Sequence, residues 1–220
     1  MTIIVALPRA PHPMPQTPVS LPDFRREKRL RRNGLWPIAG IDEVGRGCLA
    51  GPVAAAAVIL DPSDVPDGLD DSKRLPAAMR EALYEEILAR GLAVAVAFVS
   101  AADIDQINIR QASLTAMRRA LAALAIAPSY VLIDGNDLPA DLACPGEAII
   151  KGDSLSASIA AASIVAKVAR DRLMTRLCSA HPAYGFSRHV GYATPEHLAA
   201  IAKHGPSPYH RLSFSPLRQI

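Results

Sequence analysis

From residue 36 onward, short apolar runs alternate with polar and glycine-rich stretches. Three such runs come early, at residues 36–42 (WPIAGID), 51–60 (GPVAAAAVIL) and 92–100 (LAVAVAFVS). Two more follow at 130–134 (YVLID) and 147–151 (EAIIK). Their length and their content of β-branched residues are typical of buried strands, so the pattern predicts five strands.

Apolar residues at spacings of three or four predict helices between and after these strands. Pro76 suits a first helical turn, Thr194 can cap a helix at its start, and Gly205 can end one. The helices are expected around residues 74–90, 114–124, 155–178 and 194–205.

The order of these elements indicates how the chain is organised. Three strands with short links, followed by alternating helices and strands, predict a mixed sheet in one α/β domain. We expect this domain to span residues 36–220, with a helical C-terminal segment from about residue 179. A chain of 220 residues suffices for one well-buried core. The sequence contains no run of about 18 uncharged apolar residues, so no membrane span is predicted.

Residues 1–35 differ from the rest in composition. They are rich in proline and then basic, with seven basic and two acidic residues, whereas the remainder carries a net charge of −2. Without apolar periodicity, this stretch is predicted to be a disordered or loosely held arm. Its RREKRLRR run could add phosphate affinity, but a dispensable solvated tail is the favoured interpretation. No basic segment precedes its apolar start, so no secretion signal is expected.

Three cysteines, widely spaced and without a C-x-x-C pair, predict free thiols and a reducing, cytoplasmic location.

Four carboxylates stand where predicted strands end. Asp42 and Glu43 close the first strand, Asp134 closes YVLID, and Asp153 follows EAIIK and is expected to open the long helix. If these ends are adjacent in space, the carboxylates raise one another's pKa unless cations lie between them. Clustered oxygen ligands favour Mg²⁺ or Mn²⁺, and two such ions can promote in-line phosphodiester hydrolysis.

Other chemistries fit the sequence less well. The six histidines form no HExxH motif and no pair near these strands, which argues against zinc and against metal-free RNA cleavage. The glycines of GRGCLAGP miss the dinucleotide-binding spacing by one position, and no G-K-[ST] motif is present. The acidic pair just upstream would repel a pyrophosphate. We therefore reject a nucleotide-binding turn.

Residues 37–214 resemble the ribonuclease HII family, the type 2 ribonucleases H. The segments that carry the resemblance occur in the family's order: IAGIDEVGRGCLAGPVAAAAVIL, DDSKRL, LIDGN, KGDS, ASIVAKVARD, YGF, GYATPEH and HRLSF. The resemblance implies a ribonuclease H-like fold, with a mixed five-stranded sheet flanked by helices and a C-terminal helical extension.

The same resemblance implies roles for individual residues. Asp42, Glu43, Asp134 and Asp153 match the family's metal-binding catalytic carboxylates; Asp42 and Asp153 are expected to share the water-activating ion. The backbone of Gly45-Arg46-Gly47 matches the turn that reads the ribose 2′-hydroxyl. Tyr192 matches a tyrosine that packs on the sugar at the RNA–DNA junction. The remaining matches are Lys73 and Lys151 near phosphates, and Ser163, Lys167 and Arg170 in supporting positions.

Two positions depart from the family pattern. Val190 stands where a lysine is common, and Leu212 replaces an arginine, so weaker duplex binding is expected there.

The implied function is an endonuclease for RNA–DNA hybrids and for DNA duplexes containing ribonucleotides. It would cut on the 5′ side of a ribonucleotide, leave 3′-hydroxyl and 5′-phosphate ends, act as a monomer and remove misincorporated ribonucleotides. The alternatives are a non-catalytic hybrid-binding module and another nuclease of this superfold that acts on DNA. Four retained carboxylates count against the first, because binding phosphates gains nothing from negative charge.

Overall fold

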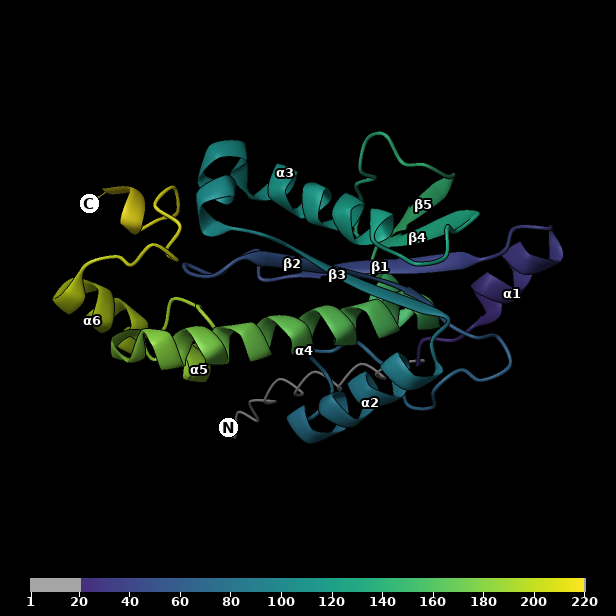
Figure 1. Cartoon of the computed structure of the whole chain (residues 1–220), viewed down its shortest axis with the longest axis horizontal. Coiled ribbons are helices and arrows are strands. Elements are labelled where there is room, and N and C mark those ends of the chain that lie inside the picture. The colour runs from purple at the N-terminus through teal and green to yellow at the C-terminus, as the bar shows by residue number, and fades with distance from the viewer. Residues whose placement is uncertain (1–20, 220) are drawn as a thin grey trace, which may run out of the picture.

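The computed structural model of the chain describes residues 21–219, and its centre is a five-stranded sheet (Figure 1). The strand order is β3-β2-β1-β4-β5, antiparallel from β1 through β2 to β3 and parallel from β1 through β4 to β5. The predicted mixed sheet of five strands is therefore confirmed. The strands are β1 (Ile38–Val44), β2 (Val53–Ile59), β3 (Ala93–Val99), β4 (Tyr130–Asp134) and β5 (Gly146–Ile149).

Helices cover both faces of the sheet. Helix α3 (Ala101–Ala122) lies on one face, and the long helix α4 (Ala157–Ala180) runs along the other, with α2 (Ala77–Arg90) packed on its outer side (Figure 1). Because side chains alternate along a strand, β1 supplies both layers. Ala39 and Ile41 pack into the cluster that contains α3.

Gly40 determines how closely α4 can approach β1. A Cβ added at Gly40 would lie 2.1 Å from the carbonyl carbon of Ser158, so only glycine fits. The first turns of α4 are rich in buried alanines, which also permit close contact. The start of α4, and the turn that precedes it, are thereby held directly against the central strand.

The four predicted helices are present, with corrections at their ends. Asp153 does not open the long helix: it lies in a separate turn, η1 (Gly152–Ser154), and α4 begins after the cap residue Ser156. Helix α3 starts earlier than expected and is kinked at Asn108, whose φ is 65°. Helix α6 (Pro195–His204) has the Thr194 cap and ends at Gly205, as predicted.

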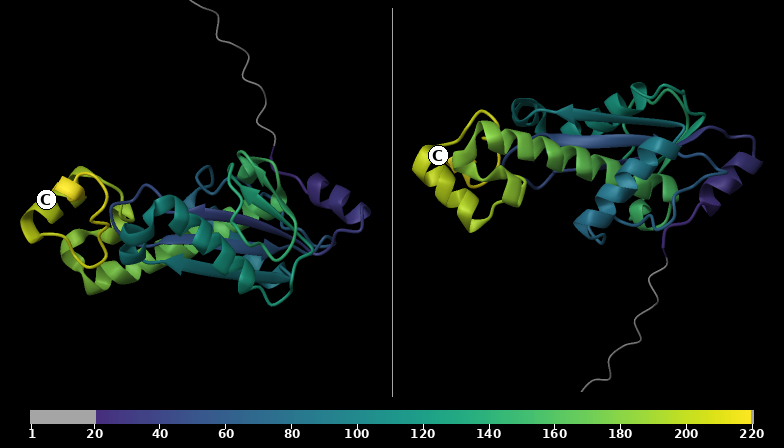
Figure 2. Two further views of the ribbon diagram at one scale, coloured as in Figure 1. Left: turned by 90° about the horizontal axis from the view of Figure 1, so that it is seen from above. Right: turned by 60° about the horizontal axis from the view of Figure 1, so that its bottom comes forward.

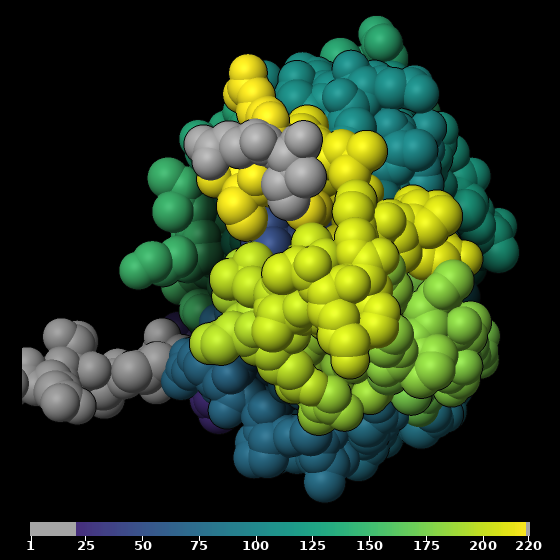
Figure 3. Space-filling view, turned by 90° about the vertical axis from the view of Figure 1, so that its left-hand side faces the viewer, coloured from purple at the N-terminus to yellow at the C-terminus, as the bar shows by residue number. Residues whose placement is uncertain are grey.

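Residues beyond α4 gather at one end of the molecule, opposite α1 (Figure 2). Figure 3 faces this end and shows the C-terminal residues in yellow over much of it. Their elements are η2 (Pro182–Tyr184), α5 (Phe186–His189), α6 and η3 (Leu217–Gln219). The predicted helical C-terminal extension is confirmed.

Residues 21–35 of the predicted disordered or loosely held arm are described by the structure. They include a helix, α1 (Arg25–Arg32), whose residues Glu27 and Leu30 are buried. The Glu27 carboxylate accepts hydrogen bonds from the Ser156 hydroxyl (2.6 Å) and the Ser158 amide (3.0 Å) at the start of α4. This anchoring depends on residues far along the chain, so the local composition did not reveal it. Residues 1–20, with the rest of the predicted arm and the expected lack of a secretion signal, lie outside the described residues.

Two smaller expectations concern the described part of the chain. No helix there is long and apolar enough to span a membrane. Cys48, Cys144 and Cys178 are all free, as predicted.

A chain of hydrogen bonds joins two buried histidines in the C-terminal segment. His197 Nδ1 lies 2.8 Å from the carbonyl oxygen of Tyr192, and its Nε2 lies 3.0 Å from His210 Nε2. His210 Nδ1 accepts from the Ser207 amide at 2.8 Å. Because a carbonyl only accepts, this geometry requires both rings to be neutral, with His210 donating to His197.

We expect replacement of Glu27 by alanine to destabilise the protein by about 1–3 kcal/mol, because it leaves the Ser156 hydroxyl and the Ser158 amide buried without an acceptor. The melting temperature would fall by roughly 2–4 °C for each kcal/mol lost. Thermal denaturation measures the change. Lys28→Ala, at an exposed position on the same helix, is the control and is expected to change little. Equal melting temperatures for the two variants would contradict the anchoring role.

We also expect the histidine pair to make stability depend on pH. Burial, and then the neighbouring His197, lower the pKa of His210 to about 4. In the unfolded chain this pKa is about 6.5, so the unfolded state binds more protons between these values. The stabilisation is therefore complete above pH 6.5 and is lost as the pH falls towards 4. Melting temperatures across this range are expected to drop more steeply for the wild type than for His210→Gln, whereas His204→Gln, at an exposed position, keeps the wild-type slope.

Candidate active site

Register in the parallel part of the sheet places two carboxylates side by side. Ile41 of β1 pairs with Ile133 of β4, so Asp42 and Asp134 occupy the next, adjacent positions. Strand β4 ends at Asp134, whereas β1 continues to Val44, and both side chains lie on the α4 side according to the alternation along each strand. Sequence positions 92 residues apart thus converge through one hydrogen-bonding pattern.

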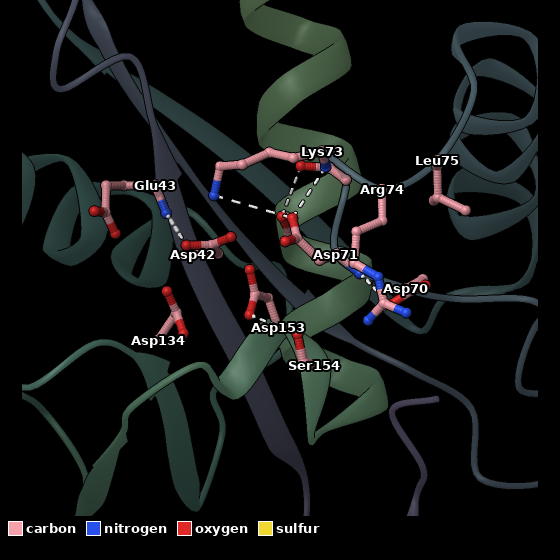
Figure 4. Close-up of polar contacts among 12 residues, drawn as sticks. Asp42, Glu43, Asp70, Asp71, Lys73, Arg74, Leu75, Asp134, Asp153 and Ser154 are labelled. Atoms are coloured by element: carbon pink, nitrogen blue, oxygen red, sulfur yellow. Dashed lines mark hydrogen bonds and ion pairs between the residues drawn. The ribbon is translucent and has the colours of Figure 1, made fainter. Parts of the chain in front are cut away.

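The turn after β5 adds a third carboxylate. Asp134 Oδ1 accepts a hydrogen bond from the Gly152 amide at 2.6 Å, which draws the η1 turn towards β4. Asp153 follows directly and is buried. Asp42, Asp134 and Asp153 each offer an oxygen, and these three oxygens lie within 4.8 Å of one another (Figure 4). The predicted convergence therefore holds for these three residues.

Glu43 points elsewhere. Adjacent residues on a strand face opposite sides of the sheet, so Glu43 turns away from the Asp42 carboxylate (Figure 4). Its Oε1 lies 3.2 Å from Nη1 of Arg46, and it lines a small hollow with Asp134 and residues of α3 such as Ser113. The structure thus sets the fourth predicted ligand beside the cluster.

Negative charges held at this spacing disfavour their own ionised forms. The pKa of Asp42 is raised well above its usual range, chiefly by burial and then by the charges of Glu43, Asp134 and Asp153. A hydrogen bond from Ser163 on α4 opposes this rise. Burial and the charge of Asp134 also raise the pKa of Asp153. The cluster is therefore stabilised by any bound cation.

Lys73 provides a protein cation at the rim. Burial lowers its pKa, but the carboxylates of Asp71 and of the three clustered aspartates outweigh this effect, and the net pKa is raised. Its Nζ lies 3.9 Å from Asp71 Oδ1 (Figure 4). Asp71, which the sequence analysis did not select, also raises the pKa of Asp153 and so belongs to the site's electrostatics. Its signal was the acidic doublet of DDSK.

The loop that follows β1 is joined to the loop carrying Tyr192. The carbonyl of Gly191 accepts hydrogen bonds from the amides of Leu49 (2.8 Å) and Ala50 (3.3 Å). The Tyr192 side chain is 44% exposed, and burial, followed by the neighbouring Cys48, raises its pKa. Tyr192 therefore lies beside the Gly45–Gly47 turn with one side open to solvent.

The other predicted positions are placed as follows. Lys151 is exposed and adopts a left-handed conformation (φ 57°) next to the η1 turn. Ser163 is buried, with its Oγ 2.9 Å from Ser72 Oγ, and Lys167 pairs with Asp171. Leu212 is 53% exposed, so this departure from the family pattern alters only the surface.

Val190, the other departure, holds a strained conformation. Its φ of 45° is unfavourable for a β-branched residue. Its carbonyl accepts a hydrogen bond from Arg170 Nη1 at 2.9 Å. Arg170 is itself only 1% exposed, so it acts as a support and has no access to a bound duplex.

The donor set fits a hard divalent cation. Three carboxylate oxygens within 4.8 Å of one another suit Mg²⁺ or Mn²⁺, and the described residues bring no histidine or cysteine into this group. Such an ion would offset the burial and the repulsion that raise the pKa values of Asp42 and Asp153.

Solved structures with a similar fold define the class of protein. Ribonuclease H2 from Pyrococcus horikoshii OT3 superposes with a TM-score of 0.71 at 24% identity, over 83% of this chain and 95% of that one. The ribonuclease HII of a PCNA complex from Archaeoglobus fulgidus gives 0.69 at 29% identity, over 82% and 96%. Bst-RNase HIII in complex with Mn²⁺ gives 0.66 at 20% identity, over 83% and 68%. The fold is that of the type 2 and type 3 ribonucleases H.

Sequence relatives narrow this class to a family. The family model described as ribonuclease HII matches residues 39–216. Ribonuclease HII of Rhizobium johnstonii is 57% identical over 215 residues, covering 96% of this chain and 93% of the relative. That of Brucella ovis is 59% identical over 198 residues, covering 90% of each. The chain therefore belongs to the ribonuclease HII family and is a nuclease, as the sequence motifs predicted.

We expect Asp42→Asn to raise the melting temperature in the presence of chelator while abolishing cleavage. The amide removes a buried charge that its neighbours repel, yet keeps an oxygen to accept the Glu43 amide, which donates to Asp42 Oδ1 at 2.7 Å. The gain would be about 3 °C for each kcal/mol relieved. Adding Mg²⁺ would then raise the melting temperature less than it does in the wild type. Asp67→Asn, on the exposed surface, is the control; a melting temperature of Asp42→Asn below that control would contradict the proposed repulsion.

Proposed function

We propose that this ribonuclease cuts the RNA strand of RNA–DNA hybrids and cuts on the 5′ side of single ribonucleotides embedded in DNA. The products would carry 3′-hydroxyl and 5′-phosphate ends. The biological task that fits is removal of ribonucleotides left in DNA.

The proposal depends on one observation. The three converging carboxylates lie at the same end of the central strand β1 as the Gly45–Gly47 turn, whose residues Arg46 and Gly47 are exposed. Asp42 extends from β1 close to its end, Asp134 from the last residue of β4, and Asp153 from a turn tied to Asp134. The Gly45–Gly47 turn continues directly from β1, so a sugar at this turn would bring its neighbouring phosphate towards Asp42. This arrangement supports a cut next to the recognised nucleotide.

The carboxylates would hold two divalent ions, with Glu43 completing the set from the neighbouring hollow. When bound, such ions activate water and stabilise the leaving oxygen. Asp42 and Asp153 are the proposed ligands on the water side. For Glu43 to take part, its carboxylate must exchange Arg46, whose side chain is 51% exposed, for the ion.

Positive side chains at the rim would receive the phosphates. Lys73 Nζ extends towards the acidic cluster (Figure 4), so it can neutralise a phosphate without entering the ligand set. Arg46 is exposed beside the proposed sugar site. Lys151, exposed next to the η1 turn, and Tyr192, which is 44% exposed, would extend this surface, Tyr192 by packing on a sugar.

We expect the chain to cut a DNA duplex containing one ribonucleotide in the presence of Mg²⁺ or Mn²⁺, and not in excess chelator. Asp134→Asn is expected to abolish cutting while the fold persists, because an amide oxygen still accepts the Gly152 hydrogen bond. Denaturing gels with end-labelled strands give the position of the cut and the chemistry of both ends.

The controls separate the alternatives. An all-DNA duplex tests for a DNA nuclease of the same fold, and equal cutting of both duplexes would exclude recognition of the 2′-hydroxyl. Binding of the ribonucleotide duplex without any cutting would favour the non-catalytic module. Asp67→Asn is expected to cut like the wild type.

A further inference from the structure

Two buried arginines lie beneath the loop that would face the substrate. Arg170 is 1% exposed and Arg211 is 0% exposed. Within the described chain, neither forms an ion pair with a carboxylate; both donate their hydrogen bonds to backbone carbonyls. A buried charge without a counter-ion is costly, so stability alone gives no reason for two of them.

Arg211 binds the Gly45–Gly47 turn from inside. Its Nη2 donates to the carbonyl of Gly45 at 2.7 Å, its Nη1 to that of Arg46 at 2.9 Å, and its Nε to that of Gly51 at 3.0 Å. The planar guanidinium also lies over the Phe214 ring, 5.1 Å from its centroid. Burial lowers the pKa of Arg211 to about 10, which leaves it charged at neutral pH. The turn is therefore held by a rigid, charged fork.

The hydrogen bonds from Arg211 to two carbonyls also fix the direction in which the neighbouring backbone N–H groups point. In a planar trans peptide, the carbonyl of one residue and the N–H of the next point in opposite directions. The carbonyls of Gly45 and Arg46 point at the buried guanidinium, so the N–H groups of Arg46 and Gly47 point away from it. Both residues are exposed, and in the described part of the chain neither amide has an acceptor.

Gly47 leaves room for a ligand at this point. A Cβ added there would meet nothing within 4 Å, and its φ is not in the left-handed region, so neither packing nor conformation requires glycine. Gly45 is different: its φ is 93°, and a Cβ would lie 2.2 Å from Arg170 Nε. Gly45 thus serves the packing on the buried arginines, whereas Gly47 keeps the outer side of the turn open.

Arg170 holds the end of the same loop, at residues 50–52, and connects it to Val190. It donates to the carbonyls of Ala50 (3.1 Å) and Pro52 (2.9 Å) and to that of Val190, which precedes the Tyr192 loop. The two arginines therefore lock the position of the turn relative to Tyr192.

We propose that Arg211 is the positioning residue for sugar recognition: it aims the amides of Arg46 and Gly47 at the 2′-oxygen of the ribonucleotide. Its buried charge also strengthens these amides as donors, because it polarises the peptide groups whose carbonyls it binds. The inference rests on the proposed function, and it assigns the aim of the turn to a side chain 164 residues away from Gly47.

The test measures how strongly the enzyme prefers a ribonucleotide to a nucleotide without the 2′-hydroxyl, and not only how fast it cuts. Values of kcat/KM are measured for duplexes with one ribonucleotide and for the same duplexes with a 2′-fluoro nucleotide. Arg211→Met is expected to lower the ratio of these values by about tenfold, the worth of one net hydrogen bond, with Arg211→Lys in between. A Leu83→Ala variant, which removes a buried side chain of α2, is the control for lost stability and is expected to keep the ratio. An unchanged ratio in Arg211→Met would overturn the proposal.

Gly47→Ala gives a second measurement if Arg211→Met fails to fold. Its new methyl group would meet open space in the free protein but block the approach to the amides, so the melting temperature stays and the ratio falls. A retained ratio in Gly47→Ala would also overturn the inference. Failure of the wild type to cut the ribonucleotide duplex would instead reject the proposed function itself.

Discussion

The parallel register between β1 and β4 is the constraint on which the site depends. It sets Asp42 beside Asp134, where burial and the neighbouring negative charges raise the pKa of Asp42. A sheet held in register by hydrogen bonds cannot relax to separate them, since a shift of one residue would invert every side chain of β1. The fold thus stores an electrostatic cost that a bound cation can release.

Close packing on both sides keeps that register in place. Gly40 lets α4 rest against the central strand, and α3 fills the opposite face. The turn that carries Asp153 is then fixed between β5 and the start of α4, where α1 supplies Glu27 as an acceptor for two donors. The third carboxylate is consequently held from both sides, by the sheet and by the N-terminal helix.

Sequence reasoning succeeded where the information is local. Short apolar runs gave all five strands, and the acidic residues at their ends gave the three carboxylates that converge. It failed where partners are distant. The basic run of α1 reads as a solvated tail until Ser156 and Ser158 are seen to bind Glu27, and Arg211 looks like any arginine until its carbonyl acceptors are known. The separation of Glu43 from the cluster was predictable in part, because adjacent residues on a strand point to opposite faces of the sheet.

The attachment of α1 has a consequence for the order in which the molecule matures. Glu27 leaves the ribosome early in synthesis, but its hydroxyl partner Ser156 follows 129 positions later. Contacts this distant in the chain form late and slowly. Until the start of α4 has been synthesised, a nascent chain therefore lacks the residues that bind α1 and that hold the third aspartate in place, so the acidic site cannot assemble while the chain is still short of this helix.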